Sequence, residues 1–383
     1  MKKCTWCGKE YVDDLERCLV DGEPLYGGEP TAGTGLMPRA RPAELITDWR
    51  MGQPSTKPNP VPERPQWLDL SQIQGAFVWA EGYSRPNWKL ICETIEQRVA
   101  GENLAGAWTD AVVQWVDQLR LDLGGQYAVR SSPEFVLLSA QETRIADDLL
   151  GFAEATLEQI YSWLREAAWR WAHGKHVILL FEDQEDYYQY VAYFYRDGIH
   201  PASGGCLIHK DYVHIAMPYN GSTIRRALGH ELVHNSVVHL HLPLWLNEGL
   251  AVSFERSIAG TQTHVLDGDL RERHLAFWNH QTIQKFWAGV SFDDPGDSNM
   301  LSYSLAEILT HLLLNGASEL PAFLKAARRE DAGQTASLNV LETDLGQIAG
   351  TFLGPGEWRP KRKAISECWK AARAPDEGRL EPE

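Results

Sequence analysis

Hydrophobic residues recur three and four positions apart along much of this 383-residue chain, which is the spacing of amphipathic helices. The pattern predicts helices at residues 87–99, 104–121, 143–172, 185–195, 222–240, 244–255, 303–314 and 320–329. We expect Ser222 to cap the fifth of these helices and Pro243 to end it.

Four short apolar runs predict strands, at residues 135–140, 176–181, 206–210 and 212–218. The last two runs are close enough in the chain to form a hairpin. Strands mixed with helices in this order predict an α+β fold, with a small mixed sheet followed by a mostly helical C-terminal part.

The composition of the chain changes along its length and suggests five regions. Residues 27–66 are rich in proline and glycine and lack hydrophobic periodicity, which is typical of a linker. The predicted regions are a cysteine-containing module at 1–26, this linker at 27–66, a helical segment at 67–126, a main domain at 127–330 and a C-terminal helical extension at 331–383.

Net charge and hydropathy exclude some classes of partner. The formal charge is −16, from 52 acidic and 36 basic residues, so the mean field of the protein repels a phosphate backbone and we expect no nucleic-acid partner. No run approaches the roughly 18 apolar residues of a membrane helix, and the chain begins with a cysteine motif instead of an apolar signal core. We therefore expect a soluble, cytoplasmic protein with no membrane partner.

The six cysteines fall into two groups. Cys4, Cys7 and Cys18 cluster near the N-terminus, which favours metal binding over a disulfide framework. The scattered cysteines are interpreted as small, unreactive packing residues; they are Cys92, Cys206 and Cys368.

The N-terminal cluster contains one complete zinc knuckle, Cys4-x2-Cys7-Gly8, and a second, altered one in which Asp21 follows Cys18. It resembles the small N-terminal zinc ribbons whose second knuckle reads Cys-x-x-Asp-Gly-x-Pro-Leu. This resemblance implies a structural zinc held by the three cysteines and Asp21, in a module that is a candidate for recruiting a protein partner. A metal-free turn stabilised by Asp21 and Gly22 is the alternative.

The segment 227–255 contains the pattern His-Glu-x-x-His at His230, Glu231 and His234. In a helix, residues four positions apart lie one above the other, so both imidazoles reach toward a common point. Glu231 lies roughly 100° around the helix from His230, beside the open position of a bound metal, where it can act as a general base. A catalytic site needs a third ligand.

Two patterns compete for that ligand. The metzincin pattern needs glycine at position 237 and histidine at 240, where this chain has Val237 and Leu240. His239 and His241 miss the register, so we interpret both as ordinary polar or packing residues. The other candidate is Glu248, in the predicted helix that follows Pro243.

The stretch Asn247-Glu248-Gly249-Leu250-Ala251 resembles the Asn-Glu-x-x-Ala element of the gluzincins, the class related to thermolysin and the peptidase MA-like proteins. The resemblance implies a zincin-like fold and a catalytic zinc held by His230, His234 and Glu248. Thirteen residues separate His234 from Glu248, fewer than in thermolysin-like members. This implies a tight helix-turn-helix, as in the shorter peptidase MA-like proteins.

The same resemblance implies a metallopeptidase acting on a peptide or protein substrate, with Glu231 as general base. It assigns Tyr303 as the donor to the oxyanion, with ordinary packing as the alternative, and residues 204–207 as the edge that pairs with substrate. Glu255 is either a residue that orients a ligand histidine or a surface glutamate. The Gly-x-Met-Glu-Asn signature of aminopeptidases is absent, which favours an endopeptidase or oligopeptidase.

Two other functional readings remain. In the first, the chain is a catalytically silent peptidase-fold protein that binds or regulates a partner recruited by the zinc ribbon. In the second, the zinc only holds two helices together, which is disfavoured because structural zinc sites usually have four protein ligands.

Overall fold

The structure of the chain is a computed structural model that describes residues 66–170, 174–194, 204–258, 268–294, 296–314 and 318–373. It also describes two short strands, β1 (Lys2–Lys3) and β2 (Glu10–Tyr11), which pair antiparallel. The predicted ribbon ligands, Cys4, Cys7, Cys18 and Asp21, lie outside the described residues, as does nearly all of the predicted linker.

The described part of the chain has an α+β fold that divides into two compact units. One unit is residues 49–238, and the other is residues 239–383 together with 1–48. The division falls between Val238 and His239, whereas the sequence suggested boundaries after residues 126 and 330. The predicted segment 67–126 therefore lies in the same unit as the sheet.

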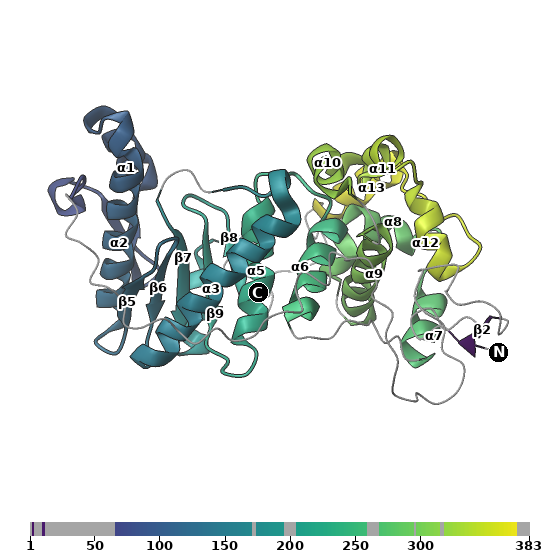
Figure 1. The fold of residues 1–383 in the computed structure, drawn as a ribbon, viewed down its shortest axis with the longest axis horizontal. Helices are drawn as coiled ribbons and strands as arrows, with labels where there is room; N and C mark the ends of the chain where they lie inside the picture. The colour runs from purple at the N-terminus through teal and green to yellow at the C-terminus, as the bar shows by residue number, and fades with distance from the viewer. Residues whose placement is uncertain are drawn as a thin grey trace, which may run out of the picture. The chain divides into compact units, whose positions relative to one another are not determined.

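The unit of residues 49–238 is built on a five-stranded mixed sheet (Figure 1). Its strands are β5 (Ala128–Ser131), β6 (Phe135–Ser139), β7 (His176–Phe181), β8 (Cys206–Ile208) and β9 (His214–Pro218), in the order β5-β6-β7-β9-β8. The three central strands run parallel, and β5 and β8 are antiparallel edges. Strands β6 and β7 are buried along their whole length, which explains their continuous apolar sequences.

Helices cover both faces of this sheet (Figure 1). The helices are α1 (Trp88–Arg98), α2 (Leu104–Leu123), α3 (Thr143–Leu164), α4 (Gln184–Ala192) and α5 (Ile224–Val237). Side chains of α2 and α4 share a core with alternate residues of β6 and β7, while α3 and α5 pack together on the opposite face. A hairpin of β3 (Phe77–Ala80) and β4 (Tyr83–Pro86) lies beside α2, and short 3-10 turns occur at Leu70–Gln72, Gly101–Asn103 and Arg165–Ala167.

Residues 239–373, where they are described, form helices and no strand. The helices are α6 (Leu244–Ile258), α7 (Gly268–Phe277), α8 (Thr282–Ala288), α9 (Asp297–Leu314), α10 (Leu320–Ala326), α11 (Gln334–Val340), α12 (Leu345–Leu353) and α13 (Arg362–Arg373), with 3-10 turns at Val290–Phe292 and Arg329–Asp331. None of the described helices in the chain is both long and apolar enough to cross a membrane.

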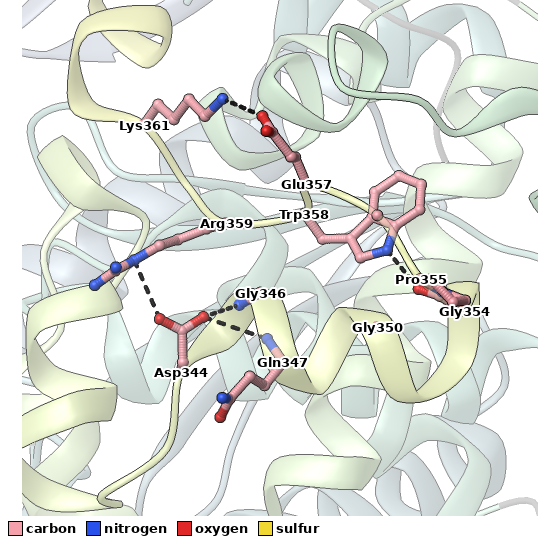
Figure 2. A pocket seen from close by; sticks show the side chains of 11 residues that line it. Asp344, Gly346, Gln347, Gly350, Gly354, Pro355, Glu357, Trp358, Arg359 and Lys361 are labelled. Carbon is pink, nitrogen blue, oxygen red and sulfur yellow. Dashed lines mark hydrogen bonds and ion pairs between the residues drawn. The ribbon is translucent and has the colours of Figure 1, made fainter.

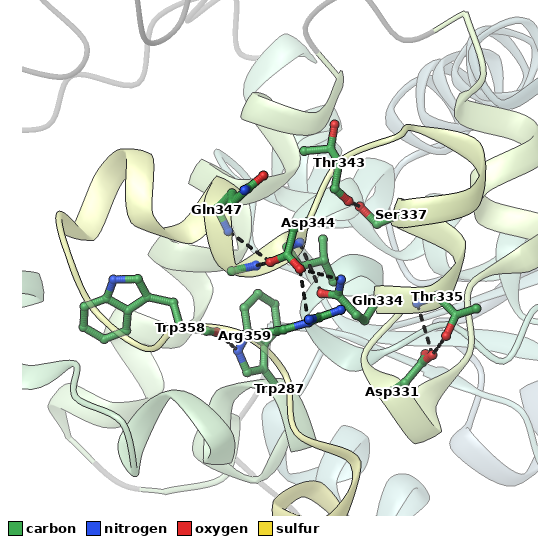
Figure 3. Close-up of polar contacts among 12 residues, drawn as sticks. Trp287, Asp331, Gln334, Thr335, Ser337, Thr343, Asp344, Gln347, Trp358 and Arg359 are labelled. Carbon is green, nitrogen blue, oxygen red and sulfur yellow. Dashed lines mark hydrogen bonds and ion pairs between the residues drawn. The ribbon is translucent and has the colours of Figure 1, made fainter.

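Polar contacts hold the last helices of this unit together (Figure 3). Asp344 caps α12 by accepting hydrogen bonds from the backbone N–H groups of Gly346 and Gln347, at 2.8 and 3.3 Å. The other oxygen of Asp344 accepts from Gln334 and pairs with Arg359, both at 3.1 Å. Residues 331–373, predicted as an extension, thus belong to the same unit as α6.

Several element boundaries differ from those predicted. Helix α3 ends at Leu164, not near residue 172, because Arg165 takes a positive φ of 48°. Helix α5 has Thr223 at its N-cap, without a side-chain capping bond, so the predicted cap at Ser222 is wrong. Helix α9 begins at Asp297, six residues before the predicted start. Strand β5 and the β3–β4 hairpin were not predicted.

Candidate metal centre

Helix α5 carries three of the predicted site residues and is firmly attached to the sheet. Its apolar face is fully buried, with Leu228, Leu232 and Val233 at 0% exposure. On the same helix the Asn235 amide donates a hydrogen bond of 2.7 Å to Nδ1 of His176, which begins β7. Burial lowers the pKa of His176 to about 4, so this imidazole is neutral at physiological pH.

His230 and His234 converge as the spacing of four predicts. Their Nε2 atoms lie 3.0 Å apart, and the rings meet edge to face with centroids 4.7 Å apart. Two ligands of a tetrahedral zinc, each about 2.0–2.1 Å from the metal, are separated by about 3.3 Å. The two nitrogens are therefore close to the separation that a shared ion requires.

Helix α6 carries Glu248 and begins directly after Pro243, whose carbonyl accepts from the backbone N–H groups of Leu246 and Asn247. It is held in the core by Trp245, which is fully buried and donates from its indole nitrogen to the carbonyl of Ala332 at 3.0 Å. The Glu248 side chain is 9% exposed.

Gly249, next to Glu248, allows α6 to lie very close to α9. A Cβ atom at this position would stand 2.6 Å from the carbonyl oxygen of Ala306 and would overlap the hydroxyl of Thr310. Because real Cβ atoms do not approach backbone this closely, only glycine fits here. The residue after the third predicted ligand therefore sets the helix packing that places α6.

One ligand atom from each of His230, His234 and Glu248 lies within 4.8 Å of the other two. Two imidazole nitrogens and one carboxylate oxygen are a donor set that suits zinc, and three protein ligands leave one tetrahedral position for water. The short connection of residues 238–243 between α5 and α6 agrees with the tight helix-turn-helix expected from the sequence. The residues present thus fit a catalytic metal.

Glu231 follows His230 on α5 and is 7% exposed. Its charge helps to raise the pKa of the Cys206 thiol, which indicates that the Glu231 carboxylate is near the edge strand β8. A carboxylate shielded from water beside a metal position is suited to accept and return a proton.

The three scattered cysteines are free thiols with partly buried side chains. Burial is the largest cause that raises the pKa of Cys206, to about 12, while a hydrogen bond from the Tyr187 hydroxyl at 3.6 Å acts in the opposite direction. Burial also raises the pKa of Cys92 and Cys368. Protonated thiols are poor nucleophiles, which agrees with a packing role.

Tyr303 lies in the second turn of α9 and not at its start, and it is half-buried. Its ring packs edge to face against Phe292, with the centroids 5.1 Å apart. This contact does not decide between a packing role and a role as oxyanion donor, and both stay predictions.

The remaining residues singled out from the sequence near the motif have different surroundings. Glu255 is half-buried on α6, and its charge raises the pKa of the buried Glu307 on α9. Its proposed role in orienting a ligand histidine stays a prediction. His239 and His241 are exposed and do not belong to the group of candidate ligands.

Some features around the centre were not predicted from the sequence. Burial, the neighbouring Asp294 and the charge of Glu248 raise the pKa of Asp293, which indicates that a further carboxylate lies near the third ligand. The His176–Asn235 contact and the close packing at Gly249 were also missed. Of these features, only the close packing at Gly249 left a signal in the sequence, because a glycine inside a helical pattern suggests close packing.

A prominent pocket in the described residues is formed by α12 and the loop that follows it (Figure 2). Its volume is about 770 Å³, and its charged lining groups are already paired, Arg359 with Asp344 and Lys361 with Glu357. None of the predicted metal or catalytic residues lines it, so we do not assign the chemistry to this pocket.

A scan against models of protein families matched none, and searches of curated proteins and of solved structures found no similar protein.

Proposed function

We propose that this chain is a zinc-dependent metallopeptidase of the gluzincin type that hydrolyses peptide bonds. The observation that carries the proposal is the group of His230, His234 and Glu248, with the shielded carboxylate of Glu231 one residue from the first ligand. A zinc ion in this donor set lowers the pKa of its bound water to about 7 and polarises a peptide carbonyl.

In this proposal Glu231 moves the proton. Its carboxylate accepts a proton from the attacking water as the C–O bond forms, and it then delivers that proton to the amide nitrogen as the C–N bond breaks. Its low exposure supports this role, because a site that excludes bulk water prevents loss of the transferred proton. General acid–base catalysis of this kind typically contributes about 10² to 10⁴ in rate.

Strand β8 is the proposed docking edge for the substrate. It pairs with β9 on one side and with no described strand on the other, and it lies against α5. The backbone groups of an exposed edge strand can pair with an extended peptide. Gly204 and Gly205 precede β8, so an approaching main chain meets few side-chain atoms there.

The finer assignments follow the same proposal. Tyr303 donates a hydrogen bond to the oxyanion, and the enzyme acts as an endopeptidase or oligopeptidase. The N-terminal ribbon, with Cys4, Cys7, Cys18 and Asp21, holds a second, structural zinc and recruits a protein partner.

Cleavage of a mixed peptide library, combined with zinc analysis, tests this function. We expect the wild type to cleave, and we expect Glu231→Gln to keep its zinc while its rate falls by at least about 10². Glu272→Gln, at an exposed position on α7, is the matched control and should cleave like the wild type.

Three outcomes would speak against the proposal. Wild-type cleavage rates in Glu231→Gln would remove Glu231 as the base. A wild type that binds zinc at this centre but cleaves no peptide would favour the silent binding protein. A fourth protein ligand at the metal would favour a structural zinc.

A further inference from the structure

The β3–β4 hairpin, in the unit of residues 49–238, has an exposed apolar strand. Strand β3 reads Phe77-Val78-Trp79-Ala80 and pairs with β4 on one side and with no described strand on the other. Val78 is 54% exposed and Trp79 is 66% exposed. Natural proteins usually protect an edge strand with a charge, a proline or a bulge, and β3 has none of these.

The turn of the hairpin sets the hydrogen-bonding pattern of β3. The two turn residues, Glu81 and Gly82, have φ angles of 50° and 81°, which are typical of a type I′ turn. Such a turn is closed by a hydrogen-bonded pair, here Ala80 with Tyr83. Bonded and non-bonded pairs alternate along the two strands, so the backbone of Val78 also bonds to β4.

The backbone groups of Phe77 and Trp79 consequently point away from β4. Phe77 lies opposite Pro86, which has no N–H group to donate. The next pair is hydrogen-bonded again, because the N–H of Asn87 donates to the carbonyl of Ala76 at 2.8 Å. No described residue bonds to the outward N–H and C=O groups of Phe77 and Trp79, so these groups can pair with a further strand.

We propose that β3 pairs antiparallel with β3 of a second copy of this chain, which forms a two-fold symmetric dimer. Pairing centred on Val78 places Phe77 opposite Trp79 of the second copy, and the reverse. All of the outward groups are then used, in about four hydrogen bonds. A shift by one residue would set outward groups against inward ones, so the strand matches its own copy in this register.

The exposed side chains also suit a second copy. Successive residues of a strand alternate between its two faces, so Val78 meets its own copy on the symmetry axis, while Trp79 lies beside Phe77 of the other copy. Cross-strand aromatic pairs of this kind are favourable in sheets. The strand carries no charge, and the two copies of Glu81 lie at opposite ends of the paired region, so like charges are not opposed.

This interface is small, because only four residues of each copy pair. Its buried area stays below the roughly 1,200 Å² of a standard interface, which indicates a weak, transient dimer. We expect a dissociation constant on the order of 100 µM. The dimer is independent of the proposed peptidase activity.

Sedimentation equilibrium of the full chain tests this pairing, and we expect the wild type to be partly dimeric at about 300 µM. Val78→Lys should raise the dissociation constant at least about tenfold, because it opposes two like charges on the symmetry axis. A mixture of Val78→Lys with Val78→Glu should form dimers again, since opposite charges then meet. Leu338→Lys, at an exposed leucine on α11, is the matched control and should dimerise like the wild type.

The proposal is overturned if the wild type stays monomeric at this concentration, which would leave a strand from elsewhere as the occupant of this edge. It is also overturned if Val78→Lys dimerises like the wild type, or if the mixture of charge variants dimerises no better than either variant alone. Should circular dichroism show that Val78→Lys does not fold, Trp79→Ser decides. This variant removes the aromatic pair and should raise the dissociation constant about tenfold, and an unchanged constant overturns the proposal.

Discussion

The two helices that carry the candidate ligands are anchored in different ways. Helix α5 is tied to a buried sheet by a polar contact between Asn235 and a neutral histidine, His176. Helix α6 packs only against helices and turns in the described residues. It is held by the buried indole of Trp245, which bonds to Ala332, and by close packing of Gly249 against the backbone of α9. The group of candidate ligands needs both helices in place. It therefore depends on the Asn235–His176 contact, which protonation of His176 would disturb, and on the packing at Gly249, which a larger side chain would disturb.

A drop in pH should destabilise the unit of residues 49–238 most. Burial lowers the pKa of His176 and His214 there to about 4, against about 6.5 in an unfolded chain. Between these values the unfolded state binds protons that the folded state does not, so the free energy of unfolding falls as the pH drops from 6.5 to 4. Each histidine contributes at most about 3 kcal/mol to this loss.

The unit of residues 239–383 contains two opposing groups. Burial lowers the pKa of His274 to about 4 and raises that of Glu307 to about 7, although Arg256 acts against the second shift. A raised carboxyl pKa makes the folded state more stable as the pH falls from 7 toward 4.5, which offsets the histidine. Hydrogen exchange of peptides from each unit, followed from pH 7.5 to 4.5, should show earlier loss of protection in residues 49–238. Equal loss in both units would contradict this prediction.

A substitution of Gly249 tests the packing anchor. Gly249→Ala should lower the free energy of unfolding by about 3 kcal/mol, because the added Cβ meets the backbone of α9. Gly151→Ala on α3 is the control, since nothing lies within 4 Å of a Cβ there and alanine favours an exposed helix by up to about 1 kcal/mol. Urea unfolding measures both, and similar effects of the two changes would refute the close packing of α6.

A substitution of Asn235 tests the polar anchor and should have the smallest effect. Asn235→Ala leaves Nδ1 of the buried His176 without its donor and should cost about 1–3 kcal/mol in urea unfolding. Asn103→Ala changes an asparagine that makes no capping bond and should stay within about 0.5 kcal/mol. No difference between these variants would show that the contact does not hold α5.

The sequence predicted the features that depend on local pattern. The bounds of β7 agree with prediction, because a continuous apolar run between polar residues marks a fully buried strand. The convergence of His230 and His234 follows from the helix repeat alone. Glu248 was predicted as a ligand because Asn247 and Ala251 flank it in the Asn-Glu-x-x-Ala pattern. In the structure its carboxylate lies close to both histidines.

The features that were missed depend on contacts between distant segments. The role of Gly249 requires the position of Ala306, and that of Asn235 requires His176, 59 residues away. Helices α7 and α8 were not predicted, and α11 to α13 were predicted only together, as a helical extension. Polar contacts of Asp344 and Asp331 fix α12 and α13, and no periodicity reveals such contacts.

The most direct test of the candidate metal centre is a crystal structure with diffraction data recorded at the zinc absorption edge. We predict an anomalous peak about 2.0–2.2 Å from Nε2 of His230, from Nε2 of His234 and from a carboxylate oxygen of Glu248. A zinc-loaded crystal with no peak at these three side chains, or with the Glu248 carboxylate turned away from both histidines, would show that they do not form a metal centre.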